Sequence, residues 1–282
     1  MVENRPFLDF LTHLVLIVGV LIVAFPVYIA FIASTHEPSA FVRGVMPLLP
    51  GDNLVQSYST MLGEGHQIAG TPPVWLMLGN SLLMALIISV GKIAISITSA
   101  FAIVYFRFPF RTLAFWIIFV TLMLPVEVRI IPTYAVVANL DMLNSYAGLT
   151  LPLIASATAT FLFRQFFMTV PEELMEAARV DGAGPMKFFK DILIPISITN
   201  IAALFVIMFI YGWIQYLWPL LITTQEQFYT IVMGIKRMLS LADREPEWNL
   251  VMATVILAML PPVLVVLFMQ RLFVKGLVES EK

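Results

Sequence analysis

The sequence predicts an all-α polytopic membrane protein with six transmembrane helices. Apolar residues make up 60% of the 282-residue chain, charged residues only 12%, and the mean hydropathy is +0.93. A soluble domain carries about twice that share of charged residues. Uncharged apolar runs recur along the chain, and a helix needs about 20 such residues to cross the hydrocarbon core of a bilayer.

Six runs are long enough to cross, and we expect helices because a helix pairs every backbone group within its own segment. The runs are continuous rather than alternating, which argues against a transmembrane barrel. The third run is the weakest, because its uncharged part after Arg111 is short. We predict spans at about 11–33, 79–104, 112–133, 142–163, 199–221 and 248–270.

Charge placement predicts the orientation. With six spans both termini lie on one side, and that side carries ten of the 16 lysine and arginine residues, against five on the other side and Lys92 inside the second span. Basic residues favour the cytoplasmic side. We therefore expect both termini and the loop 165–198 in the cytoplasm, with the long loops 34–78 and 222–247 outside. The first span is too long for a signal peptide, and we expect an uncleaved anchor.

The loop 165–198 contains a predicted helix, turn and second helix. Thr169 and Glu172 have the spacing of a capping box, and Pro171 suits a first helical turn. Gly182 and Gly184 are expected to end the first helix through positive φ angles.

Pro185 is expected to open the second helix, and Pro195 to close it before the fifth span. Ala177 and Ala178 give the first helix a thin, flat surface, which suits docking into a groove of another protein. An amphipathic loop lying on the membrane surface is an equal alternative from these residues alone.

Residues of this loop also carry a family pattern. They are Glu176, Ala177 and Ala178, then Asp181, Gly182 and Ala183, and later Ile192 and Pro195. The pattern resembles the EAA loop of binding-protein-dependent ABC importer permeases. The resemblance implies a type I importer permease fold, a single transmembrane domain over residues 1–282, and a coupling helix in this loop that docks on an ATPase subunit.

The resemblance extends along the whole chain and is nearest to the maltose-type sugar importers. It rests on Asn80-Ser81, on Pro125 with Ile131-Pro132, and on Trp218-Pro219-Leu220-Leu221. Longer stretches at 99–109, 121–129, 146–167 and 276–282 resemble permeases for sn-glycerol 3-phosphate, which implies that cargo. Glycerophosphodiesters and a neutral sugar or oligosaccharide stay as alternatives. The wider pattern has Trp-Asn in the fifth span, where this chain has Trp213-Ile214-Gln215.

The same resemblance implies the partners. They are a homologous second permease, a homodimeric ATPase, a periplasmic binding protein and the phospholipid of a bacterial inner membrane. ATP and Mg²⁺ are expected on the ATPase, because this chain lacks the G-x-x-x-x-G-K-[ST] phosphate loop. The chain is therefore expected to be a non-catalytic subunit, and its net charge of −2 gives no reason to expect a nucleic acid partner.

Four residues are candidates for the substrate path. Lys92 lies inside the second span, where a charge costs at least a few kcal/mol and is a functional candidate by default; snorkelling or pairing is the alternative. Arg129, near the outer end of the third span, can meet an anionic substrate or anchor the interface. Trp213 and Gln215 lie in an unusually aromatic fifth span. For Trp213 the alternative to substrate contact is packing. Gln215 is the polar group that could hydrogen-bond to the substrate or to the partner permease.

Two other function classes fit less well. A secondary transporter needs coupling carboxylates near the midplane, and the spans carry none there. An intramembrane enzyme needs a base, yet the three histidines all fall in the first quarter of the chain, and none follows Gly79-Asn80-Ser81. With no cysteine in the sequence, disulfides and thiol catalysis are excluded.

Overall fold

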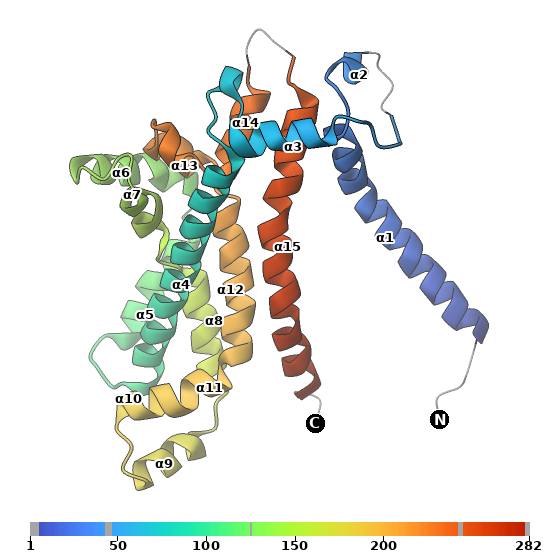
Figure 1. Cartoon of the computed structure of the whole chain (residues 1–282). Helices are drawn as coiled ribbons and strands as arrows, with labels where there is room; N and C mark the ends of the chain where they lie inside the picture. The colour runs from blue at the N-terminus through green and yellow to red at the C-terminus, as the bar shows by residue number, and fades with distance from the viewer. Residues whose placement is uncertain (1–5, 43–46, 125, 242–244, 280–282) are drawn as a thin grey trace. The chain divides into compact units, whose positions relative to one another are not determined.

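The computed structural model describes residues 6–42, 47–124, 126–241 and 245–279, and every regular element in these ranges is a helix (Figure 1). Pro125 of the family pattern and the last three residues of the stretch 276–282 lie outside the described residues. The chain divides into two compact units. One consists of Met1–Leu76 with Gly234–Leu260, and the other of Met77–Met233 with Pro261–Lys282. The division falls inside three helices, α4, α14 and α15.

The first unit contains the N-terminal helix, the elements of the predicted outer loop 34–78, the later part of the loop 222–247 and the start of the last predicted span. Its elements are α1 (Pro6–Ser34), α2 (Ser39–Val42), α3 (Leu54–Gly63), η1 (Gln67–Ala69), most of α14 (Ile231–Leu239) and the first part of α15 (Trp248–Glu279).

The second unit contains the remaining predicted spans and the predicted cytoplasmic loop. Its elements are α4 (Val74–Tyr105), α5 (Arg111–Val120), η2 (Thr121–Met123), α6 (Val126–Asn139), α7 (Tyr146–Thr150), η3 (Leu151–Leu153), α8 (Ala157–Phe167), α9 (Glu172–Val180), α10 (Pro185–Phe188), the π-helix η4 (Phe189–Leu193), α11 (Ile194–Ile196), α12 (Ile198–Trp213), α13 (Leu217–Ile222) and η5 (Glu226–Phe228).

Three helices are long and apolar enough to cross a membrane, at Phe10–Ser34, Val74–Tyr105 and Trp248–Leu272. Three further pairs of helices pass the same test but bend by more than 40°, so the described residues provide up to six spans. Six is the number predicted from sequence. The predicted third span, 112–133, is not a straight helix, because α5 and α6 are bent against each other.

The other two bends have local causes. Between α7 and α8 the direction changes by 44°, and Ser156 starts α8 by accepting a hydrogen bond from the Ala159 N–H at 3.3 Å. Before α12 the direction changes by 73°, after a π-helix and Pro195, which lacks a backbone N–H. The Ser197 hydroxyl donates there to the Leu193 carbonyl, which also accepts a hydrogen bond from the Ser197 backbone N–H at 3.1 Å.

Two apolar clusters hold the second unit together. The inner cluster joins α4, α8, α9, α10, η4 and α12; its buried residues are Ile97, Ala100, Phe101, Ala159, Phe163, Phe167, Ala178, Phe188, Phe189, Leu193, Leu204 and Met208. The outer cluster joins α4, α6, α7 and α13 through Met84, Ile88, Ile130, Val137, Leu149, Trp218 and Ile222. Helix α4 contributes to both clusters, and its Lys92 falls between the two sets in the sequence.

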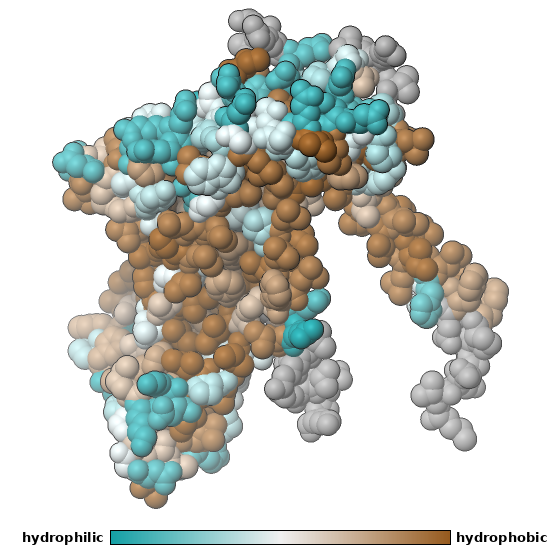
Figure 2. Space-filling view, viewed as in Figure 1, coloured by the Kyte–Doolittle hydropathy of each residue, from teal (hydrophilic) through white to brown (hydrophobic). Residues whose placement is uncertain are grey.

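The surface of this unit agrees with a membrane-spanning orientation. Figure 2 shows an apolar belt over the middle of its helices and polar side chains at both ends, near α6 and α13 and again near α9 and α10. Burial of large side chains in the described chain is modest, and many leucine, isoleucine and valine residues are exposed. Lipid or partner helices must therefore cover much of this surface.

A buried polar residue links the N-terminal part of α4 to neighbouring segments. Asn80 is 3% exposed and donates to the carbonyls of Gln227 and Tyr229 at 2.8 and 3.0 Å. Its own carbonyl oxygen accepts from the Tyr146 hydroxyl at 2.8 Å. The next residue, Ser81, accepts from the Ile231 N–H at 2.8 Å. These bonds join α4 to α7 and to the segment around η5, so the Asn80-Ser81 pair has a structural role.

We predict that Asn80→Ala destabilises this end of the molecule. Each buried group left without a partner costs roughly 1–3 kcal/mol, so the melting temperature of the purified protein in detergent should fall clearly. Asn139→Ala is the matched control, because Asn139 is exposed at the end of α6 and makes no side-chain hydrogen bond to a described residue. Equal melting temperatures for the two variants would contradict the role assigned to Asn80.

Candidate functional site

The predicted cytoplasmic loop folds as a helix, a tight turn and a second helix. Helix α9 ends in a Schellman motif: the Ala183 N–H donates to the Ala178 carbonyl at 2.8 Å, and the Gly182 N–H to the Arg179 carbonyl at 3.0 Å. Gly182 has φ +73°, a conformation that residues with a Cβ rarely adopt. Gly184 has φ −72° and precedes Pro185, which opens α10 as predicted.

Three local predictions for this loop are wrong. The Thr169 hydroxyl donates to the Phe166 carbonyl at 2.7 Å, and α9 begins after Pro171 without a side-chain cap, so Thr169 and Glu172 form no capping box. Gly184 does not have positive φ, because the single turn at Gly182 already ends α9. Pro195 lies inside α11 and does not close the helix; the break comes at Ser197.

The exposed face of α9 is partly the one expected. Ala178 is only 5% exposed and packs into the inner cluster, so it does not contribute to a flat outer surface, contrary to the prediction. Ala177 is exposed, and so is Glu176 beside it. The sequence pattern did not predict the exposure of Val180. Its side chain is 88% exposed and lies on the same face as Ala177, three residues away.

The remaining residues of the EAA pattern lie partly on the buried side of the loop. Ala183 and Ile192 are half-buried and pack against the inner cluster. Asp181, Gly182 and Pro195 are exposed. The pattern therefore has two parts, an outer face that is free to bind and an inner face that anchors the loop on α4, α8 and α12.

A cavity of about 450 Å³ lies between α4, α6, α8, α12 and the η2 segment. Its wall contains both cation candidates together with hydroxyl groups; the lining residues are Lys92, Thr121, Leu122, Leu124, Arg129, Ala155, Ser156, Ala157, Thr158, Ile207, Met208 and Tyr211. Two parts of this wall, 121–124 and 155–158, lie at or beside the places where bent helix pairs break. Irregular backbone at membrane depth is tolerated where it lines a cavity.

Lys92 is the most buried charge of this cavity. It is 6% exposed, and its Nζ lies 3.5 Å from the centre of the Tyr211 ring, a cation–π contact. Arg129 is exposed on the same cavity. Among the side chains that the structure describes, which do not include that of Glu127, no carboxylate lies within ion-pair distance of either cation. The site therefore presents positive charge without a protein anion to neutralise it.

The other two candidates do not line this cavity. Trp213 is 4% exposed and stacks on Phe209 with ring centres 5.8 Å apart, so the packing alternative describes it. The Gln215 amide donates to the Tyr211 carbonyl at 3.0 Å and satisfies a free group at the end of α12. Tyr211 is the aromatic residue that reaches the cavity, and its helical position alone gave no signal of that contact.

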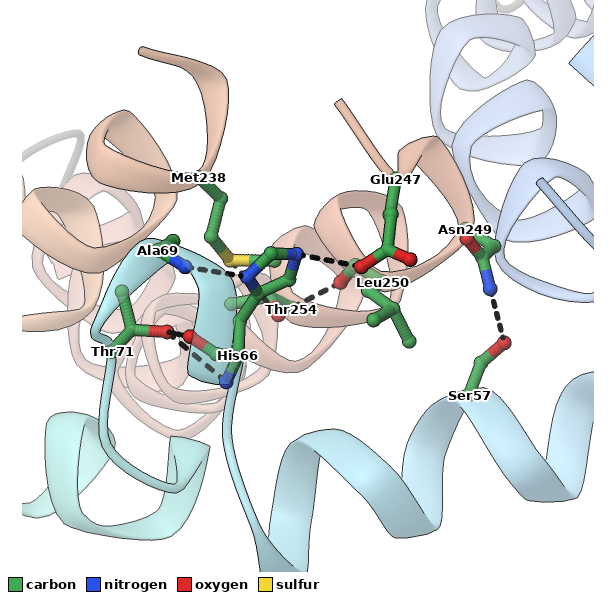
Figure 3. A network of polar contacts seen from close by, with 9 residues as sticks. All are labelled: Ser57, His66, Ala69, Thr71, Met238, Glu247, Asn249, Leu250 and Thr254. Carbon is green, nitrogen blue, oxygen red and sulfur yellow. Dashed lines mark hydrogen bonds and ion pairs between the residues drawn. The ribbon is translucent and has the colours of Figure 1, made fainter. Parts of the chain in front are cut away.

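The first unit has its own polar network, shown in Figure 3. His66 is 2% exposed; its Nδ1 accepts from the Ala69 N–H at 3.0 Å, and its Nε2 lies 2.9 Å from a Glu247 carboxylate oxygen. Asn249 donates to Ser57 at 3.2 Å. These contacts tie the turn after α3, and α3 itself, to the start of α15. Within the described ranges no group of histidine, cysteine and acidic residues has the arrangement of a metal site.

Bent membrane helices that line a charged cavity are features of membrane transport proteins. The family model for the inner membrane component of binding-protein-dependent transport systems matches residues 92–279. The chain belongs to this family and is a permease subunit of an ABC importer.

Relatives match from end to end. The chain is 59% identical to the sn-glycerol-3-phosphate transport system permease protein UgpE of Agrobacterium fabrum, over 100% of both chains. It is 58% identical to the protein of that name from Brucella melitensis and 59% identical to that from Salmonella typhi, again over 100% of both chains.

A solved structure gives the fold. The chain superimposes with a TM-score of 0.79 on a chain of a bacterial ABC transporter involved in the import of the acidic polysaccharide alginate, covering 96% of this chain and 98% of that one at 19% identity. The predicted all-α, type I importer permease fold is confirmed.

The turn at Gly182 generates a prediction about local stability. A Cβ added at Gly182 or at Gly184 would meet no other atom within 4 Å, so the two glycines differ in φ and not in space. Gly182→Val should strain the turn by about 1–2 kcal/mol and raise amide exchange at Ala183 by roughly 5–30-fold. Gly184→Val should exchange as the native protein does. Equal exchange in both variants would refute the argument from φ.

Proposed function

We propose that this permease imports sn-glycerol 3-phosphate across the bacterial inner membrane by alternating access. The observation that carries the proposal is the cavity with Lys92 and Arg129, two cations without a carboxylate partner among the described residues. A phosphate monoester is the type of cargo that supplies the missing negative charge. Arginine also binds phosphate oxygens in a bidentate manner. The names of the full-length relatives support the same cargo.

The charge of such a cargo explains the need for an energy source. A phosphate monoester carries roughly −1.5 to −2 charges at neutral pH. Inward movement against an inside-negative potential costs about 2.3 kcal/mol per charge per 100 mV, or roughly 3.5–4.6 kcal/mol in total. A passive pore would exclude the anion, so import must be coupled to another reaction.

We assign that coupling to partners. ATP and Mg²⁺ bind on a separate homodimeric ATPase, a second homologous permease completes the pathway, and a periplasmic binding protein delivers the cargo. This chain is then a non-catalytic subunit. Both termini are placed in the cytoplasm, on the side of the greater number of basic residues.

The exposed face of α9 supports docking on a protein rather than on the membrane. It carries Ala177 and the apolar Val180, which suit a groove, and three glutamates, Glu172, Glu173 and Glu176, which an anionic cytoplasmic leaflet would repel. The pattern residues Asp181, Gly182, Ala183, Ile192 and Pro195 shape and anchor this docking helix.

The inner cluster provides a physical connection from α9 to the cavity. Ala178 of α9 and Met208 of α12 belong to the same cluster, and Met208 also lines the cavity. Movement of α9 by the ATPase therefore displaces a packed body that includes α12 and its Tyr211. Because packed interiors do not deform continuously, such a body moves as a unit and changes which side of the membrane the cavity faces.

Replacement of Arg129 tests the cargo. Loss of a charge-assisted hydrogen bond costs roughly 1.5–3 kcal/mol, so Arg129→Gln should transport labelled glycerol 3-phosphate about tenfold to hundredfold more weakly. Arg129→Lys should retain part of the activity, because it keeps the charge but not the bidentate geometry. Expression and complex assembly are checked in parallel. Unchanged uptake by Arg129→Gln, or uptake of neutral sugars in place of the phosphate ester, would overturn the assignment.

Cysteine labelling tests both orientation and docking, because the native chain has no cysteine. Val180→Cys should react with a membrane-impermeant thiol reagent only from the cytoplasmic side, and an assembled ATPase should protect it. Glu226→Cys, also at an exposed position, should react only from outside. Labelling of both from one side would refute the orientation, and labelling of position 180 that the ATPase does not change would refute docking at α9.

A further inference from the structure

A second basic pocket lies at the end of the spans, away from the substrate cavity. It has a volume of about 160 Å³ and is formed by the end of α4, the start of α5 and the end of α8. Its lining residues are Ile103, Val104, Arg111, Thr112, Phe115, Arg164 and Met168. Two arginines from different helices therefore face one small pocket with a largely apolar wall, and the proposed transport cycle uses neither of them.

Neither arginine has an anionic partner among the described residues. Within the described side chains, no carboxylate lies within ion-pair distance of Arg111 or Arg164. The Arg164 Nε is buried, and no described group accepts a hydrogen bond from it. The guanidinium carbon of Arg164 lies 4.1 Å from the centre of the Phe115 ring, and this contact fixes the group in place. Arg164 is half-buried, whereas Arg111 is exposed at the same pocket. Two guanidinium groups that line one pocket repel each other, and an anion between them offsets this repulsion.

The start of α5 adds further donors to the same pocket. Arg111 and Thr112 are the first two residues of α5, and the helix has no side-chain cap. The first N–H groups of such a helix have no partner within it. With the two guanidinium groups, these donors match an anion that has several oxygen atoms, such as a phosphate.

The outer surface of α5 indicates what carries this phosphate. Leu113, Trp116 and Ile117 follow Arg111 along α5, lie three or four residues apart on one face, and are 53–60% exposed. Met168 at the pocket is 57% exposed. An apolar strip that runs from a basic pocket at a span end has the chemistry to receive both parts of a phospholipid, the acyl chains on the strip and the headgroup in the pocket.

We propose that Arg111 and Arg164 form a binding site for the phosphate of an anionic phospholipid. Because α8 leads directly into the segment before α9, a bound lipid would hold the start of the docking loop at the membrane. The proposal depends on the chain being a membrane protein and not on the identity of its cargo.

Native mass spectrometry of the full-length protein in its assembled membrane complex tests this site. Complexes are delipidated and then titrated with dioleoylphosphatidylglycerol or dioleoylphosphatidylcholine. The native protein should retain phosphatidylglycerol in preference to phosphatidylcholine. The variant Arg111→Gln should bind it about tenfold more weakly, as expected for the loss of one charge-assisted contact, and Arg111→Gln with Arg164→Gln weaker still. Arg271→Gln, an exposed arginine of α15, is the matched control and should bind as the native protein does.

Two further measurements separate the alternatives. The variant Arg164→Lys keeps the charge if Arg164→Gln fails to fold, and should retain most of the lipid. Inorganic phosphate at millimolar concentration should not displace the phosphatidylglycerol; displacement would identify a site for free anions and overturn the lipid assignment. Equal binding of the two lipids, or loss of the second permease rather than of lipid from the Arg111→Gln complex, would also overturn it.

Discussion

Every backbone N–H and C=O group inside a bilayer needs a hydrogen-bond partner, and this requirement must be met wherever a span of this permease breaks. At the start of α8 the Ser156 side chain accepts from the Ala159 N–H, and at the end of α12 the Gln215 amide donates to the Tyr211 carbonyl. Polar side chains thus replace helical bonds that are missing at these two places. Before α12 the Ser197 hydroxyl adds a second hydrogen bond to the Leu193 carbonyl, which also accepts from the Ser197 N–H. Wall residues 121–124 and 155–158 lie at or beside two of the breaks, so irregular backbone there faces the cavity.

The same constraint explains how a buried lysine is tolerated. Helix α4 packs into an apolar cluster on either side of Lys92, with Met84 and Ile88 before it and Ile97 and Phe101 after it. Only the cavity between these clusters lets the ammonium group avoid hydrocarbon, and the Tyr211 ring lies over it. Packing of α4 in both clusters holds the Lys92 ammonium group at this cavity beside Tyr211, and it does not extend to the interface.

The inner cluster also fixes α9, the helix for which we propose docking, to the spans. A loop helix attached by flexible chain alone would transmit little force, but Ala178 and the half-buried Met175 pack α9 on the aromatic residues of α4, α8 and α10. Phe101 contacts Phe189 with ring centres 4.6 Å apart, and Tyr105 contacts Phe188 at 5.3 Å. The small size of Ala178 is therefore needed on the inner side, where the chain must approach this aromatic layer closely.

The sequence by itself determined the features that depend on local chemistry. Long uncharged runs require helices in a membrane, and a glycine is needed where the chain turns with positive φ, as at Gly182. Composition and the loop pattern were therefore sufficient for the fold class and for the family. The tertiary structure decided the features that depend on contacts between distant segments. In the tertiary structure Ala178 packs inward, Trp213 stacks on Phe209, and the Gln215 amide caps the end of α12. Lys92 and Arg129 line one cavity. Arg111 and Arg164 line one pocket. Sequence periodicity indicates on which face of a helix a residue lies. Which other helix or cavity that face contacts depends on how the bent spans pack together.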